Sequence, residues 1–193
     1  MKHKVTPRHR SFAIAFTIGA ACCCTGGYAA EVFWNGTGTS WNAGASWVGN
    51  QAPAIGDTAV FNCNGVGATQ KVCLNANQTI AGLIFNANAT GGVSVVGGEA
   101  TGRTLTLGGA GIVVNNGAGP VTISTGYDGV VTVVMSSSQT WVNDSNSLLI
   151  VGGNISHSAS TACTLTIGGS GSGDVLISGS ISNRPNIATT AVT

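Results

Sequence analysis

Charged side chains are scarce in this sequence. Asp, Glu, Lys and Arg make up 7% of its 193 residues, against about a quarter in an average soluble protein. Four of the seven basic residues lie within positions 1–10, which leaves three basic residues and six acids in the rest of the chain. That remainder has no basic patch to neutralise phosphates. The sequence therefore predicts no nucleic-acid partner and no attraction to anionic membrane surfaces.

Long apolar runs are also missing, because no stretch reaches the ~20 residues that a membrane-spanning helix needs. The run SFAIAFTIGAACCC at 11–24 follows the basic head and precedes the small residues Gly27 and Ala29. This order is typical of a secretory signal peptide, which we place at 1–29 and expect to be helical; an uncleaved anchor is the alternative. We therefore predict a secreted protein, extracellular or at the cell surface, with no transmembrane span in the mature chain.

Cysteine is limited to Cys63, Cys73 and Cys163 once the leader is set aside. Export implies an oxidising compartment in which disulfides persist. In AVFNCNGVGATQKVCLN, two strand-like runs flank a glycine-rich turn and carry cysteines that face each other, so we predict a Cys63–Cys73 disulfide, with two free thiols as the alternative. Cys163 is then either buried or paired between molecules. No CxxC or neighbouring histidine supports a zinc site in this part.

Short alternating runs dominate what is present. Examples are TLTLGG, PVTIS and VVTVV, which are rich in Val, Ile, Leu and Thr and bounded by Gly, Asn, Asp or Ser. Such runs are typical of strands with one buried face; Leu105 and Leu107 should point one way, Thr104 and Thr106 the other. No window keeps the spacing of an amphipathic helix, so the fold is predicted to be all-β.

Repetition favours a solenoid over a sandwich. TLTLGG at 104–109 returns as TLTIGG at 164–169, and PVTIS at 120–124 returns as DVLIS at 174–178. We interpret these offsets as three periods of about 20 residues, which places the two TLT segments on the same side of a β-solenoid, about three coils apart. Repeats would fill 63–193 as about six to eight coils, with glycine pairs at the corners. A β-sandwich is the alternative.

Residues 30–62 differ from the repeats, because Trp34, Trp41 and Trp47 lie close together there. A tryptophan buries up to ~250 Å², so three of them could close the N-terminal end of the rod as a capping segment. Aromatic side chains also line sugar-binding grooves. Carbohydrate contact by these three residues is therefore the alternative interpretation.

The chain resembles the autotransporter-associated β-strand repeat proteins of bacteria. The resemblance lies in Trp-Asn-Gly at 34–36, Ser-Trp at 46–47, Ala-Pro at 52–53, GDTAVF at 56–61 and TIAGLIFN at 79–86. It implies an exported, right-handed parallel β-helix with a structural or adhesive role. Members usually continue into a membrane barrel or a sorting tail, which this sequence does not show. We therefore expect a short member, a fragment or a decayed copy, whose open end invites end-to-end self-association.

Residues that could carry chemistry are few and dispersed. The acids outside the leader lie at positions 31, 57, 99, 128, 144 and 174. Asp128 and Asp144 are the candidates for an acidic pair, but both sit in turn-like contexts where Asp braces its own backbone. His157, the only histidine beyond the leader, is predicted to lie in an exposed loop without a GxSxG partner motif. GGSGSGD at 168–174 misses the calcium-binding register by one position. We predict no catalytic, metal or cofactor residues, and no enzyme.

These patterns favour an exported structural or adhesin-like β-solenoid, and the resemblance is compatible with the head of a longer autotransporter-type surface protein. Its partners would be polysaccharide or other cell-surface material. Two alternatives stay open: a carbohydrate-binding module that uses Trp34, Trp41 and Trp47, and a β-helical polysaccharide-degrading enzyme.

Overall fold

Strands make up nearly all the regular structure in the computed structural model, which describes residues 29–62, 68–98, 102–124, 129–182 and 190–192. A single 3-10 turn, η1 (Gly44–Ser46), interrupts them in this part of the chain. The strands are β1 (Glu31–Trp34), β2 (Thr58–Phe61), β3 (Gln70–Leu74), β4 (Gln78–Phe85), β5 (Val93–Gly97), β6 (Arg103–Val114), β7 (Val121–Ile123), β8 (Val131–Met135), β9 (Gln139–Asn143), β10 (Leu149–Val151), β11 (Ile155–His157), β12 (Cys163–Gly168), β13 (Val175–Ile177) and β14 (Thr190–Val192).

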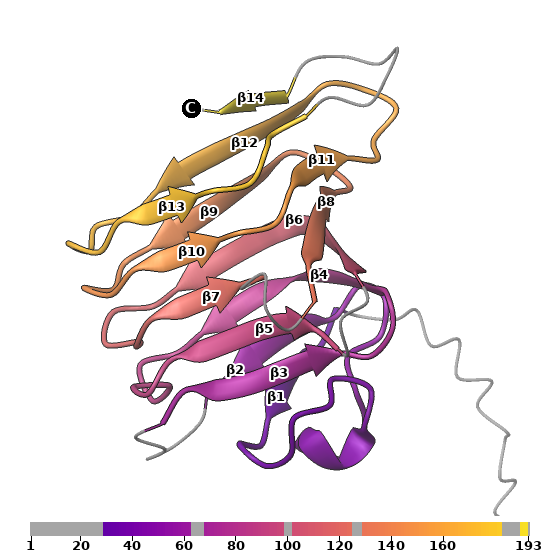
Figure 1. Ribbon diagram of the computed structural model, residues 1–193, viewed down its shortest axis with the longest axis vertical. Coiled ribbons are helices and arrows are strands. Elements are labelled where there is room, and N and C mark those ends of the chain that lie inside the picture. Colours follow the sequence, from indigo (N-terminus) through magenta and orange to yellow (C-terminus); the bar gives the residue numbers. More distant parts are fainter. Residues whose placement is uncertain (1–28, 63–67, 99–101, 125–128, 183–189, 193) are drawn as a thin grey trace, which may run out of the picture.

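The strands form two sheets that wind around one axis. A five-stranded sheet has the order β3-β5-β7-β10-β13, and a nine-stranded sheet follows β1-β2-β4-β6-β9-β12-β14, with β8 and β11 beside it. Every pairing between these named strands is parallel. In Figure 1 the front strands run left to right and those behind run back as the chain climbs, so the winding is right-handed. The predicted β-solenoid is confirmed and the sandwich is excluded.

The coils are longer and fewer than the sequence predicted. Val93, Val121, Leu149 and Val175 stack in one column of the five-stranded sheet, so successive coils take 28, 28 and 26 residues. The rod has about five turns, not six to eight. The 54-residue echo between 120–124 and 174–178 spans two coils and not three. The predicted period of about 20 residues was too short, because each coil also contains the turns between its strands.

The two TLT segments belong to the same sheet but to different columns. Thr104–Leu107, in the N-terminal half of β6, pairs with β8. The segment 165–168 pairs instead with β9, and β9 pairs with the C-terminal half of β6. The likeness of the two segments therefore reflects a shared alternation, not equivalent positions. The glycine pair at 108–109 lies inside the continuous strand β6, between the half that pairs with β8 and the half that pairs with β9, while β12 ends at Gly168.

Alternation along the strands builds the core as predicted. Leu105 and Leu107 are 0% exposed, while Thr104 and Thr106 on the opposite face are only partly buried. Aliphatic side chains from successive coils stack inside the rod in the same way. Because each coil covers the apolar face of the one below, the core exists only as a property of the stack.

An aromatic cluster fills the N-terminal end of the rod. Trp47 meets Trp34 and Trp41 edge-on, with ring centroids 5.0 Å apart in each pair. All three rings pack against Phe61, which stacks on Phe85 of the next coil at 5.0 Å and 11°. The segment between β1 and β2, including η1, lies across this end in Figure 1. This geometry supports a capping role for the segment.

The opposite end is less covered. Val175 and Ile177 of β13 occupy the columns of Leu149 and Val151, yet they are partly exposed where the residues below them are 0% exposed. Among the described strands, β13 pairs only with β10. End-to-end self-association through such an end stays a prediction.

The predicted leader lies outside the described residues, except for Ala29. In the part of the chain that is described, no helix has the length and apolar character needed to cross a membrane.

Candidate functional site

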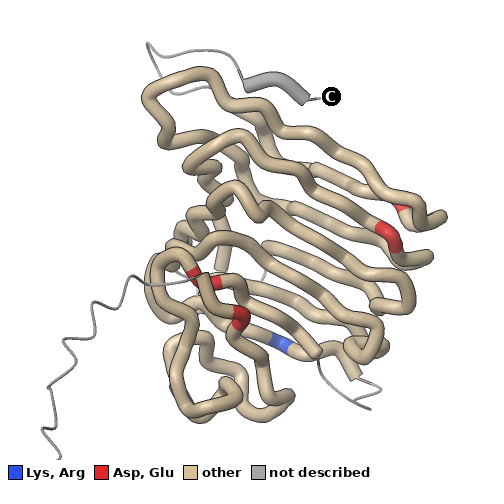
Figure 2. The backbone as a smooth tube through the Cα atoms, turned by 180° about the vertical axis from the view of Figure 1, so that it is seen from behind, with Lys and Arg blue, Asp and Glu red and all other residues tan. Residues whose placement is uncertain are grey.

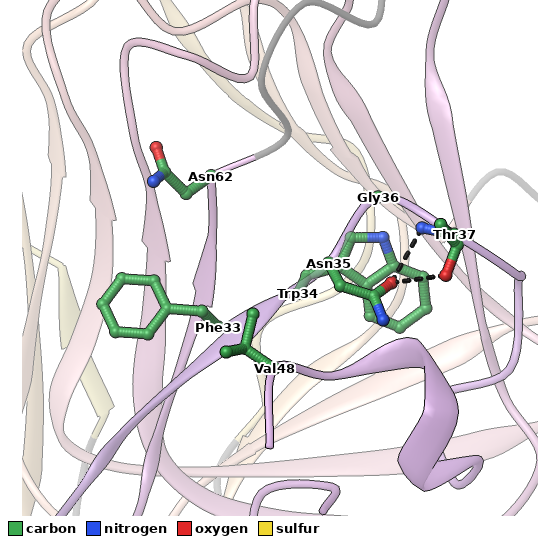
Figure 3. Close-up of a pocket in the computed structure, with 7 residues that line it drawn as sticks. All are labelled: Phe33, Trp34, Asn35, Gly36, Thr37, Val48 and Asn62. Carbon is green, nitrogen blue, oxygen red and sulfur yellow. Dashed lines mark hydrogen bonds between the residues drawn. The ribbon is translucent and has the colours of Figure 1, made fainter. Parts of the chain in front are cut away.

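A hollow of about 540 Å³ lies beside the edge strand β1 (Figure 3). Its lining combines apolar and polar side chains: Phe33, Trp34, Asn35, Gly36, Thr37, Val48 and Asn62. The volume falls within the ~300–1,000 Å³ of ordinary small-molecule sites. No charged residue is among the described residues that line it.

Local backbone pairing places the apolar part of the hollow. The N–H of Val48 donates to the carbonyl of Phe33 at 2.8 Å, and that of Asn35 donates to the carbonyl of Ser46 at 3.0 Å. The chain after η1 therefore runs antiparallel to β1 and brings Val48 beside Phe33. Alternation turns Trp34 into the core, where it is 1% exposed, and turns Phe33 outward, where it is only partly buried. Val48 is 62% exposed.

The two asparagines of the hollow differ in what their amides do. Asn35 Oδ1 accepts from the backbone N–H of Thr37 at 2.8 Å and from its hydroxyl at 2.7 Å, and Asn35 Nδ2 donates to the carbonyl of Ala45 at 2.5 Å. Asn35 thus holds the loop together. Asn62 has no hydrogen-bond partner for its amide among the described residues, and its side chain extends in the same direction as Phe33 (Figure 3).

A second hollow of about 330 Å³ adjoins the first and shares Phe33 and Val48 with it. Asp57 lines this second space, but both oxygens of its carboxylate are occupied. Oδ1 accepts from the N–H of Ala30 at 3.1 Å, and Oδ2 accepts from the N–H of Ala54 at 2.8 Å. Asp57 therefore braces the loop before β2, as Asp commonly does in turns.

The tryptophans that the sequence offered for sugar contact are buried. Trp34 and Trp47 are 1% exposed and Trp41 is 0% exposed, so no ring face is open to a sugar in this structure. The indole of Trp47 also donates from Nε1 to the carbonyl of Trp41 at 2.6 Å. Their positions favour capping over carbohydrate contact. The outward aromatic at this end is Phe33, which sequence reasoning missed although period-two alternation from Trp34 would have placed it outside.

The predicted disulfide falls partly outside the described residues. Cys63 is not described, and Cys73 is a partly buried thiol that forms no disulfide with another described cysteine. The Cys63–Cys73 pairing stays a prediction. Cys163 is buried in the core with a free thiol, which agrees with the first of its two predicted fates.

The described residues include few acids, and Figure 2 marks only a few charged residues along the backbone. These residues contain no group of three His, Cys, Asp or Glu side chains that could hold a metal ion. Asp128, one half of the suspected acidic pair, lies outside them. Asp144 Oδ1 accepts from the N–H of Ser170 at 2.7 Å and from its hydroxyl at 2.8 Å. The backbone bond, followed by the hydroxyl bond, lowers the pKa of Asp144.

The expectation of an exposed loop at His157 was wrong. His157 ends β11, shares the inward face with Ile155, and is 3% exposed. The alternation Ile-Ser-His carries this signal, but the serines that follow obscured it. A buried histidine within the core is not placed to act on a substrate.

Polar side chains form a column along the turns that follow successive strands of the nine-stranded sheet. The strand registers place five residues above one another: Asn62, Asn86, Asn115, Asp144 and Ser170. Asn115 Nδ2 donates to Asn86 Oδ1 at 2.7 Å, and Ser170 donates to Asp144 as described above. Hydrogen bonds between coils thus take the place of ion pairs on this edge, one between the neutral amides of Asn115 and Asn86 and two to the Asp144 carboxylate. The column begins at the hollow.

No protein-family model, no curated protein and no solved structure matches this chain. The resemblance to autotransporter-associated repeats therefore stays a prediction.

Proposed function

We propose that this protein is an exported, non-catalytic β-solenoid with a structural or adhesin-like role, and that it forms the head of a longer autotransporter-type surface protein. The observation that carries the proposal is the in-register stacking of parallel coils into a rod whose chain carries few charged residues (Figure 2). Such a rod presents long columns of similar side chains, which suit repeated contacts with a polymer or a surface.

The use of the acids supports a non-catalytic role. Asp57 and Asp144 each accept two hydrogen bonds from their surroundings. A glycoside hydrolase of the usual kind needs two carboxyl groups that face each other across the glycosidic bond, one to donate a proton and one to act as base or nucleophile. Carboxylates already committed to bracing the backbone are poorly placed for either task.

Two experiments test the proposal. The full chain is expressed in bacteria with and without residues 1–29, and cell fractions are probed for it; we expect export only with the leader. Polystyrene beads coated with the mature chain are then applied to bacterial biofilm matrix. We expect retention of these beads above that of albumin-coated beads. Retention equal to albumin, or a chain that stays in the cytoplasm, would contradict the proposal.

A further inference from the structure

We propose that the hollow beside β1 is a binding site for a neutral polysaccharide, with Phe33 and Asn62 as its contact residues. This inference rests on the proposed adhesive role and names the class of ligand and the face that binds it. It moves the sugar-binding surface from the buried tryptophans to the outward side of the same strand.

The apolar part of the hollow suits one face of a sugar ring. A pyranose has a flat face of C–H groups, which is amphipathic relative to its ring of hydroxyls. Phe33 offers an aromatic surface that is only partly buried, and the exposed Val48 lies next to it. Covering these two side chains with C–H groups removes apolar area from water and supplies the nondirectional part of the binding free energy.

The polar part of the hollow suits sugar hydroxyls. The Asn62 amide carries two N–H donors and one acceptor oxygen, with no partner among the described residues. A pair of neighbouring hydroxyls can donate to its oxygen and accept from its nitrogen at the same time. Asn35 and Thr37, by contrast, bond to each other and keep the rim of the hollow rigid, which lowers the entropy cost of binding.

The charges around the hollow favour a neutral ligand over an anionic one. The hollow itself has no charged lining residue in the part described, and the adjoining hollow carries Glu31 and Asp57. Glu31 lies two residues before Phe33 on β1, so alternation places both on the outward face. A polysaccharide rich in carboxylates or sulfates would be repelled there.

The site continues along the rod. Above Asn62, Asn86 and Asn115 follow at the spacing of parallel strands, about 4.8 Å per coil. Asn115 Nδ2 donates to Asn86 Oδ1, which leaves the N–H groups of Asn86 and the oxygen of Asn115 for a ligand. The partly buried side chains of Ile84 and Val113 lie beside them on the same outward face. This repeat is comparable to the length of one sugar unit in an extended chain. Longer chains should therefore bind more tightly than a disaccharide.

The test measures binding of the mature chain to defined probes. Affinity electrophoresis uses gels that contain mannan, xyloglucan or a β-1,3-glucan, with polygalacturonate as the anionic probe, and calorimetry then compares the hexasaccharide with the disaccharide of the best probe. We expect retardation by at least one neutral probe and none by polygalacturonate. Phe33→Leu and Asn62→Ala should each weaken binding about five- to tenfold, since each loses a stacking face or hydrogen bonds.

One variant serves as a matched control. Leu176→Ala removes an exposed apolar side chain (48% exposed) from the other sheet and should leave the affinity unchanged. Asn62→Ala leaves the core intact, so it tests the site even if Phe33→Leu lowers stability. Thermal unfolding followed by circular dichroism checks the fold of every variant.

Three outcomes would overturn the inference: no neutral probe binds, the anionic probe binds best, or folded Phe33→Leu and Asn62→Ala bind as the parent does. Beads coated with each variant separate this inference from the function. If beads coated with parent and variant protein adhere equally well, the hollow is not the adhesive site, but the adhesive role of the protein is still supported. Parent beads that do not adhere would contradict the adhesive role itself, whatever the sugar affinity.

Discussion

Asn143 joins two successive turns of the rod through its side chain. Its Nδ2 donates to the carbonyl oxygens of Ser147, Gly173 and Asp174 at 2.9, 3.0 and 3.1 Å. Its Oδ1 accepts from the N–H of Ser145 at 3.2 Å and from the hydroxyl at 2.8 Å. The residue is only 2% exposed, so water cannot easily replace the amide once it is removed.

Asn143→Ala should therefore lower the free energy of unfolding substantially. The amide nitrogen has two hydrogens for three carbonyl acceptors, and the oxygen serves Ser145, so about three net hydrogen bonds are lost. At about 0.5–1.5 kcal/mol each, the loss is about 1.5–4.5 kcal/mol. Urea unfolding of the mature chain, followed by far-UV circular dichroism, measures it.

Asn146→Ala is the matched control. Asn146 lies on the same turn and accepts from the N–H of Ser172 at 3.4 Å and from its hydroxyl at 3.0 Å, but it is exposed to solvent. We expect a loss below about 1 kcal/mol, as for most surface substitutions. Equal losses for Asn143→Ala and Asn146→Ala would refute the reasoning, because burial of the amide is what separates the two.

Three further predictions use the same unfolding assay. Trp47→Ala should lower the free energy of unfolding by about 3–5 kcal/mol, because it leaves a cavity in the aromatic cluster at the N-terminal end of the rod. A loss below about 1 kcal/mol would contradict the capping role of that segment. Gly111→Ala should lower the free energy of unfolding by more than about 2 kcal/mol, and Gly49→Ala should lower it by only about 1 kcal/mol. Both glycines have a positive φ (+61° and +86°), but only at Gly111 would an added Cβ collide with backbone atoms. The pKa of Asp144 is lowered below 3.8 by its hydrogen bonds to Ser170. These bonds therefore stabilise the fold above that pH, and the stabilisation is lost as the pH falls through the lowered pKa. The free energy of unfolding of Asp144→Asn should consequently fall less on acidification than that of the parent.

The alternation of the strands could be predicted because it is local. Each short run shows which side chains face the core, and the burial of Leu105 and Leu107 follows directly. The number of coils could not be predicted in the same way. Coils of different length hide their own period, and the TLT pattern recurs wherever a strand alternates Thr with an aliphatic residue.

The candidate site depends on a contact that local patterns do not contain. Phe33 becomes part of a hollow only because the chain after η1 returns antiparallel to β1 and sets Val48 beside it. Asn62 joins them through the parallel pairing of β1 with β2. Three tryptophans in a short segment drew attention to this region, but their size made them core residues and left the smaller aromatic outside.

Neutral amides and hydroxyls, in place of ion pairs, join neighbouring coils along the turn edge of the rod. Mobile ions screen interactions between charges, and they act weakly on dipoles in contact. Such a rod should keep its shape in fresh water and in brine alike. If the protein is exported as proposed, this indifference to salt is useful, because no regulated cytoplasm sets the ionic strength outside the cell.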